Sequence, residues 1–255
     1  MTEDVVITRR DGVMEICFNR PDKKNALTRA MYAAVVEAFE AADADASVRV
    51  LLLTGTGDTF TSGNDIKDFQ QRAATNAVSG ASPFLTALST LKKPLVAAVN
   101  GAAVGVGTTM LAHCDLIVAA RSARFVMPFT GLGLVPEAGS SLLFPQIVGT
   151  HRANALLLLG EPMTAETAQQ WGFVHQVVDD DALMQTAYAV AARLAVLPPE
   201  AVRQTKQLIR HGAADLPGRI AEELALFGAR VRSPEAAEAF AAFVEKRRPD
   251  FSRFS

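Results

Sequence analysis

One carboxylate interrupts an apolar, glycine-rich stretch near the middle of the chain. Glu137 lies in FTGLGLVPEAGSS, residues 129–141, and the apolar side chains around it are Phe129, Leu132, Leu134 and Val135. A charged group held away from water is costly unless it is paired or its pKa changes. Apolar neighbours would disfavour the charged form of Glu137 and so strengthen it as a base. The alternative is an acid that only stabilises the start of a helix near Ser140, an effect of about 0.3–1 kcal/mol.

Two glycine-containing stretches could supply backbone amides to the same chemistry. TFTSGNDIKDF, residues 59–69, follows an apolar run and contains Gly63, although it is also typical of an ordinary strand-to-helix turn. NGAAVGVGTTMLAHCD, residues 100–115, enters a helix through Gly101, Gly105 and Gly107. Such a helix start presents free N–H groups and the positive end of the helix dipole, which suits a developing oxyanion as well as a phosphate. Because no third glycine follows in register, a nicotinamide enzyme is not expected.

Repeated strand and helix patterns must position these stretches. Residues 4–9 and 13–19 alternate and predict a hairpin, and a helix over 28–43 has Thr28 as its cap. Continuous apolar runs predict buried parallel strands at 48–55, 94–101 and 115–120. Helices are predicted near 139–148, 150–159, 164–171, 181–196, 199–211, 216–229 and 233–247. We therefore expect an α/β core over residues 1–195 and an all-helical C-terminal region over residues 196–255, whose amphipathic face needs a partner.

Composition narrows the class of protein. The chain has 255 residues, 49% of them hydrophobic, and a formal net charge of −2, with no basic and aromatic patch for nucleic acid. The two cysteines, Cys17 and Cys114, do not make a disulfide framework, and we expect a cytoplasmic protein with neither a signal peptide nor a membrane span. No metal site is expected, because the histidines are scattered at His113, His151, His175 and His211.

Seven motifs, in order and over nearly the whole chain, resemble those of the crotonase superfamily, the enoyl-CoA hydratase/isomerase family. They are NRPDKKNAL, FTSGNDIKDF, KPLVAAVNGAAVGVG, CDLIVAARSARF, GLVPEAGSS, AETAQQWGFVHQVV and LPPEAVRQTKQLIR. The resemblance implies a crotonase-like spiral of ββα units followed by a helical trimerisation region. It also implies homotrimers or dimers of trimers.

The resemblance assigns roles to particular residues. The amides of Asn64 and Val106 would hold the thioester oxygen as it becomes an enolate, and losing one such donor typically costs about 3–4 kcal/mol of barrier. Coenzyme A would be part of the substrate, so no separate cofactor is expected. Lys23 and Lys24 could attract its phosphates or could simply form a solvated turn. The residues expected to line the acyl-CoA groove are Ala26, Thr61, Ser62, Gly63, Asn64, Asp65, Ile66, Gly105 and Phe129.

The acids distinguish the reactions of this family. A hydratase of the family uses two glutamates, whose positions hold Thr109 and Phe129 here, so hydration is disfavoured. The Δ3,Δ2-enoyl-CoA isomerases place a single glutamate where Glu137 lies. The resemblance therefore implies an isomerase that moves a double bond from position 3 to position 2. Ring-epoxide isomerisation of phenylacetyl-CoA type substrates remains an alternative, although those enzymes typically carry an aspartate there. Further alternatives are a hydratase-like protein and a non-catalytic acyl-CoA-binding protein.

Overall fold

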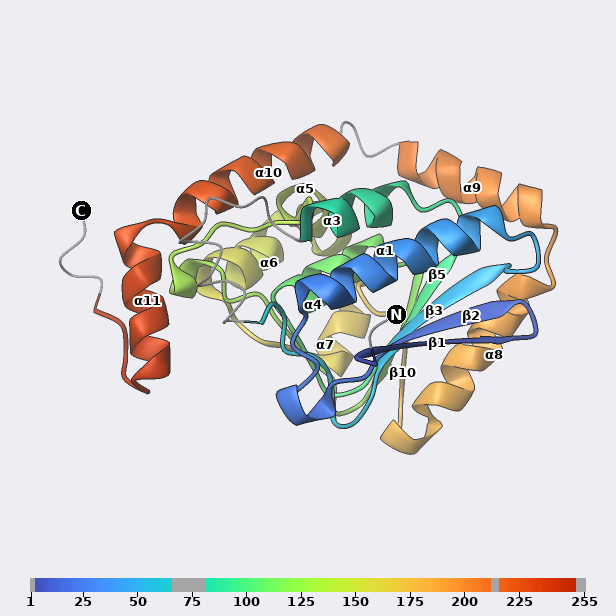
Figure 1. The fold of residues 1–255 in the computed structure, drawn as a ribbon, viewed down its shortest axis with the longest axis horizontal. Helices are drawn as coiled ribbons and strands as arrows, with labels where there is room; N and C mark the ends of the chain where they lie inside the picture. The colour runs from blue at the N-terminus through green and yellow to red at the C-terminus, as the bar shows by residue number, and fades with distance from the viewer. Residues whose placement is uncertain (1–2, 66–80, 212–215, 251–255) are drawn as a thin grey trace.

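The larger of two sheets forms the centre of the molecule. Figure 1 shows the fold in a computed structural model, which describes residues 3–65, 81–211 and 216–250. Among these residues the sheet has six strands in the order β1-β2-β3-β5-β7-β10. Their bounds are β1 (Val5–Arg10), β2 (Val13–Phe18), β3 (Val50–Gly55), β5 (Leu95–Val99), β7 (Leu116–Ala120) and β10 (Gln176–Val178). The predicted hairpin is β1 and β2, and the other neighbouring pairs are parallel. The buried parallel strands predicted from apolar runs are thereby confirmed.

Both faces of this sheet are covered, which explains why its central strands are apolar throughout. Leu51 and Leu53 of β3 pack in the main core with side chains of α1 (Arg29–Ala44) and α3 (Ala81–Thr90). Val50 and Leu52 alternate with them and pack in a second core with α8 (Leu183–Ala195). In Figure 1, α1 and α3 accordingly lie on one side of the sheet and α8 on the other.

A smaller sheet has no counterpart among the predicted elements. Its strands are β4 (Thr59–Thr61), β6 (Ala102–Val104), β8 (Arg124–Val126) and β9 (Met163–Thr164), in that order. The first three each follow one strand of the larger sheet along the chain and pair in parallel, whereas β9 is antiparallel to β8. This repeated passage from one sheet to the other produces the α/β spiral that the resemblance implies.

The predicted helices are confirmed, with ends that differ by a few residues. Thr28 caps α1, since its hydroxyl accepts a hydrogen bond from the Met31 amide. The predicted helix over 150–159 is a short α-helix that continues as a π-helix over Ala155–Leu159. In the described residues, the remaining α-helices are α4 (Val106–Thr109), α5 (Ser140–Val148), α6 (Thr150–Asn154), α7 (Ala165–Gln170), α9 (Pro199–His211), α10 (Leu216–Val231) and α11 (Pro234–Val244). Short 3-10 helices cover Pro21–Lys23, Met110–His113, Thr130–Leu132 and Asp180–Ala182.

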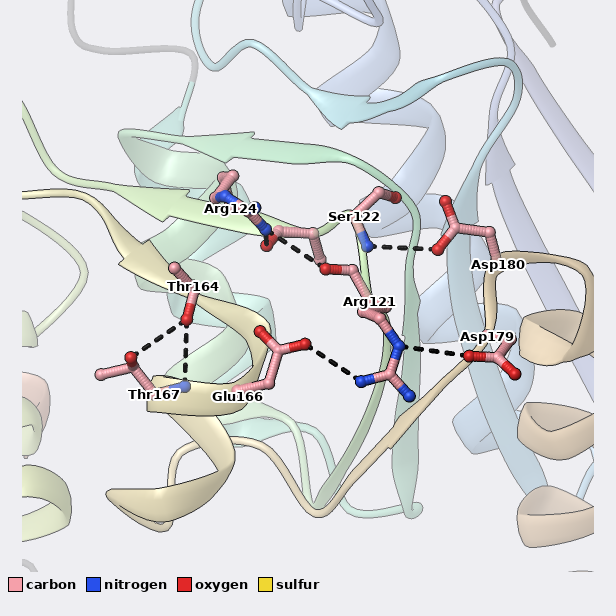
Figure 2. Close-up of polar contacts among 9 residues, drawn as sticks. Arg121, Ser122, Arg124, Thr164, Glu166, Thr167, Asp179 and Asp180 are labelled. Carbon is pink, nitrogen blue, oxygen red and sulfur yellow. Dashed lines mark hydrogen bonds and ion pairs between the residues drawn. The ribbon is translucent and has the colours of Figure 1, made fainter.

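An exposed polar cluster ties the end of β7 to α7 and to the segment after β10 (Figure 2). The Arg121 guanidinium lies 3.2 Å from Glu166 and 3.2 Å from Asp179. The Ser122 amide donates a 3.1 Å hydrogen bond to Asp180. Because these side chains are solvent-exposed, each pair contributes little to the stability of the fold. The cluster therefore fixes the register of the chain here more than it stabilises the fold.

The C-terminal helices share the main core with the rest of the chain. Ile220 and Phe227 of α10 and Ala236 of α11 are buried in it. In Figure 1, α10 passes over α3 and α5 and leads to α11 at one end of the molecule. A boundary at residue 195 stays a prediction. None of the described helices is both long and apolar enough to cross a bilayer.

Candidate active site

Two paired strands bring Asn64 and Val106 to the same edge of the smaller sheet. Asn64 follows β4 and Val106 follows β6, and these two strands are parallel neighbours. Within the described residues, neither the Asn64 amide nor the Val106 amide donates to a protein acceptor. Two unpaired amides on adjacent strand ends are the kind of arrangement that can hold a developing oxyanion.

Glycines allow these two segments to approach closely. A Cβ atom at Gly63 would lie 2.7 Å from the Val104 carbonyl oxygen, and one at Gly107 would lie 2.5 Å from Thr61 Cγ2. Gly105 precedes α4 with a φ of 57°, in the region that favours glycine. The Gly105 carbonyl accepts from the amides of Thr108 and Thr109, so the Val106 amide is left at the helix start.

The segment around Ala26 lies along residues 61–65. Hydrogen bonds join the Ser62 amide to the Lys24 carbonyl at 2.9 Å and the Leu27 amide to the Gly63 carbonyl at 2.8 Å. The structure thus brings together Ala26 and the predicted groove residues Thr61, Ser62, Gly63, Asn64 and Asp65. Ile66, also predicted for the groove, lies outside the described residues.

Asn25 holds this arrangement from within and is not singled out by the sequence analysis. It is fully buried, and its side-chain amide donates to the carbonyls of Thr56 and Thr59 at 2.9 and 2.7 Å. Its own carbonyl accepts from the Thr61 hydroxyl at 2.7 Å. Its φ of 53° is left-handed, a conformation that asparagine tolerates better than most residues. The signals in the sequence that could have indicated its role are that tolerance and its place in the motif NRPDKKNAL.

The polar side chains beyond the groove are largely engaged with one another. Arg20 forms a 2.7 Å ion pair with Asp65, and the Tyr32 hydroxyl donates to Asn64 Oδ1 at 2.8 Å. Lys24 forms a 2.8 Å ion pair with Asp58 on the surface. Asp65 and Lys24 are thus each paired with an oppositely charged side chain, and the Asn64 side chain is held by the Tyr32 hydroxyl.

Glu137 is buried, with only 3% of its surface exposed. Its Oε1 accepts a 2.5 Å hydrogen bond from the Thr109 hydroxyl, which arrives from α4. Burial raises the pKa of Glu137 to about 7; the Thr109 hydrogen bond opposes this rise, and the charge of Glu223 adds to it. A carboxyl group with a pKa near neutrality can both take up and return a proton at physiological pH.

The backbone around Glu137 makes a tight turn before α5. Ala138 and Gly139 both have positive φ, 61° and 68°. His113 Nε2 lies 2.7 Å from the Ala138 carbonyl oxygen and must donate to it. Burial lowers the pKa of His113 to about 4, so the imidazole is neutral and its donor is already used. His113 is therefore a fixed support of the turn and not a second base.

Phe129, a predicted groove residue, precedes Glu137 in the chain, and the helix α5 follows it. Phe129 is 5% exposed and begins the turn over Thr130–Leu132. The first amides of α5 are bound by Glu223, at Gly139 and Ser141, and not by the Glu137 side chain. Capping of α5 is thus supplied by another acid, which leaves Glu137 available for other work.

A comparison with known proteins decides the family. A family model described as Enoyl-CoA hydratase/isomerase matches residues 8–253. The chain belongs to the enoyl-CoA hydratase/isomerase family. Within this family it is similar to a crystal structure of an enoyl-CoA hydratase/isomerase from Pseudoalteromonas atlantica T6c, with a TM-score of 0.92 and 42% identity over 98% of this chain and 100% of that chain. The predicted family and fold class are therefore confirmed.

Two curated relatives of the enoyl-CoA hydratase/isomerase family are named as isomerases of acyl-CoA compounds. The chain is 36% identical over 260 residues to the 1,2-epoxyphenylacetyl-CoA isomerase of Escherichia coli (strain K12), across 99% of each chain. It is also 36% identical over 254 residues to human Enoyl-CoA delta isomerase 2, across 96% of this chain and 64% of the relative. The protein is thus a crotonase-family enzyme that acts on acyl-CoA.

Proposed function

We propose that this enzyme is a Δ3,Δ2-enoyl-CoA isomerase that uses Glu137 as its single proton shuttle. The observation that carries the proposal is the state of Glu137, which is buried, hydrogen-bonded to Thr109 and has a pKa of about 7. The second buried carboxylate nearby, Glu223, is occupied by two backbone amides. One carboxyl group with a pKa near neutrality suits a reaction in which one proton leaves a carbon and returns to another.

In the proposed reaction, one proton moves from C2 to C4 of the substrate. Glu137 removes a proton from C2 of a 3-enoyl thioester, the electron pair of that C–H bond forms the C1–C2 double bond of a dienolate, and the carbonyl π pair moves onto the thioester oxygen. The amides of Asn64 and Val106 stabilise the negative charge on the thioester oxygen. Glu137 then delivers its proton to C4, the thioester carbonyl re-forms, and the double bond ends between C2 and C3.

The groove is proposed to follow the residues that the structure brings together. These are Ala26 and residues 61–65, which would contact the acyl-CoA that itself carries the coenzyme. Gly105, Phe129 and Ile66, the last of which lies outside the described residues, are proposed as further contacts. Gly105 suits this role, since a Cβ atom there would meet none of the described atoms within 4 Å. Lys23 is exposed and lies 3.8 Å from Asp22, so it could meet a CoA phosphate more readily than Lys24, which would have to leave its 2.8 Å ion pair with Asp58.

The assembly and location belong to the same proposal. The exposed fractions of Leu226, Phe243 and Val244 on α10 and α11 are 53%, 61% and 63%. Apolar side chains this exposed on consecutive helices favour a contact with further copies of the chain. We therefore propose a cytoplasmic homotrimer or dimer of trimers.

Ring-epoxide isomerisation is the second candidate, because the Escherichia coli relative that catalyses it matches nearly the whole of both chains. The glutamate at position 137, in place of the aspartate typical of those enzymes, favours the enoyl-CoA reaction. Purified protein should convert 3-hexenoyl-CoA to the conjugated 2-enoyl-CoA, followed by its absorbance. Turnover of 1,2-epoxyphenylacetyl-CoA alone would favour the second candidate. Tight binding of both thioesters without turnover would indicate a binding protein.

A further inference from the structure

A second buried acid, Glu223, approaches the Glu137 turn from the C-terminal helices. Glu223 belongs to α10 and is 5% exposed. Its two carboxylate oxygens accept hydrogen bonds from the Gly139 amide at 2.5 Å and from the Ser141 amide at 3.0 Å. Amides at a helix start have no partner within their own helix, and α5 has no capping side chain at its own N-cap position. Glu223 therefore does for α5 what a local capping residue would do.

The contact between α10 and this turn extends beyond the hydrogen bonds. A Cβ atom at Gly139 would lie 2.4 Å from Leu216 Cδ1 and 3.2 Å from Ile220 Cγ1 of α10. The turn itself needs support, because Ala138 is a non-glycine residue in the left-handed region, with a φ of 61°. Glu223 and the apolar side chains of α10 thus hold Gly139, the second residue after Glu137, and Glu223 also holds Ser141.

Glu223 also brings a negative charge close to the carboxyl group of Glu137. Around Glu137, α4 contributes the neutral hydroxyl of Thr109, and the helix Met110–His113 contributes the neutral imidazole of His113. The other charged side chain of α10 near this loop, Arg230, donates to the Gly133 carbonyl and pairs with Glu235. Within the part of the chain that the structure describes, Glu223 is accordingly the charged group that raises the pKa of Glu137.

We propose that Glu223 is a positioning residue for the Glu137 base. It fixes the turn that presents the base, and its charge keeps the base from ionising too readily. The inference rests on the proposed function, in which Glu137 moves the proton. A carboxylate in the C-terminal helical region would then set both the place and the strength of a base in the spiral core.

The test compares Glu223→Gln, Glu223→Asp and the neighbouring control Glu222→Gln. Glu222 lies one residue away on α10 but is 61% exposed and pairs only with Arg219 among the described residues. The measurements are kcat, KM and the acid limb of the pH profile of kcat/KM with 3-hexenoyl-CoA. Glu223→Gln removes the charge and one acceptor, so kcat should fall about tenfold, with KM little changed. Its acid limb should move to lower pH by about half a unit to one unit, because a like charge has been removed.

The other two variants separate the effect of the charge at position 223 from the effect of side-chain length. Glu223→Asp keeps the charge but shortens the side chain, so its acid limb should stay near that of the wild type while kcat falls. Glu222→Gln should leave both quantities unchanged. If Glu223→Gln fails to fold, Glu223→Asp decides, because wild-type kcat in that variant would overturn the positioning role.

Two results for Glu223→Gln would overturn the proposal. One is a wild-type kcat with an unmoved acid limb. The other is a lower kcat with an unmoved acid limb, which would reduce Glu223 to a structural cap. Failure of the proposed function has a different signature, since the wild-type protein would then not convert 3-hexenoyl-CoA, or Glu137→Gln would convert it as fast as the wild type, whatever the Glu223 variants do.

Discussion

The Thr109 hydroxyl donates a 2.5 Å hydrogen bond to Glu137 Oε1, and both side chains are buried. A donor to the charged form of a buried acid favours ionisation, so Thr109 opposes the effect of burial on the pKa of Glu137. It also fixes the position of one oxygen of the carboxyl group.

Replacing Thr109 should therefore change the pH profile. Thr109→Val keeps the shape and removes the donor, so the pKa of Glu137 should rise and the acid limb of kcat/KM should move to higher pH. We expect kcat at neutral pH to fall about tenfold. Thr109→Ser keeps the hydroxyl and serves as the control, with a profile close to that of the wild type. An unmoved acid limb in Thr109→Val would contradict this role.

Glu137→Gln should lower kcat by roughly 10²–10⁴ and leave the binding of CoA thioesters near that of the wild type. The comparison variant is Asn64→Ala, which retains the backbone amide and loses the hydrogen bond from Tyr32. Its loss of kcat should be far smaller. Steady-state kinetics and calorimetric binding distinguish the two. Equal damage in both variants would show that the Asn64 side chain, and not its amide, does the work.

The Glu137→Gln substitution should also stabilise the folded state at high pH. Glu137 has a folded pKa of about 7 against an ordinary 4.5, so the folded state holds the proton more tightly than the unfolded state. Its contribution to stability is present below pH 4.5 and is lost as the pH rises to 7. Glu137→Gln should thus gain up to about 3 kcal/mol over the wild type at pH 8 and little at pH 4. Urea unfolding at the two pH values measures the difference; equal gains at both would contradict a raised pKa.

Hydration of crotonyl-CoA should be poor. The positions of the two water-handling acids hold Thr109 and Phe129, and Thr109 already donates to Glu137. Loss of the 2-enoyl absorbance at neutral pH should be much slower than isomerisation of 3-hexenoyl-CoA. Comparable rates would mean that one acid suffices to activate water here.

Self-association should depend on the exposed apolar residues of α10 and α11. Leu226→Asp and Phe243→Asp place a charge where a second copy would pack and should shift the protein toward monomers. Sedimentation at micromolar concentration gives the assembly state. Thr86→Asp, an exposed position on α3, is the matched control. A wild-type protein that sediments as a monomer would remove the basis for this prediction.

The sequence predicted the elements better than the links between them. Most of the long strands and helices follow from apolar periodicity, although α3 (Ala81–Thr90) is not among the predicted helices. The apolar neighbours of Glu137 indicate its burial. The smaller sheet escapes such reasoning, because β9 has only two residues and the other strands only three. In the sequence, Thr109 is informative because a hydratase of the family has a glutamate at its position. Its role as a hydrogen-bond donor to Glu137 depends on a contact between residues that are 28 positions apart in the chain. Glu223 lies in an amphipathic helix, where an acid is usually taken as solvent-exposed.

Because α10 contacts the turn that follows Glu137, the proposed site depends on a segment that is synthesised late. During synthesis the N-terminal parts of a chain can fold before the rest has emerged. A nascent chain that has emerged only as far as residue 215 already contains Asn64, Val106, Thr109 and Glu137, but not the carboxylate that binds the Gly139 and Ser141 amides. The proposed active site is therefore complete only after synthesis has passed Glu223, and a chain that terminates before it keeps its proposed base on a turn that lacks the support of α10.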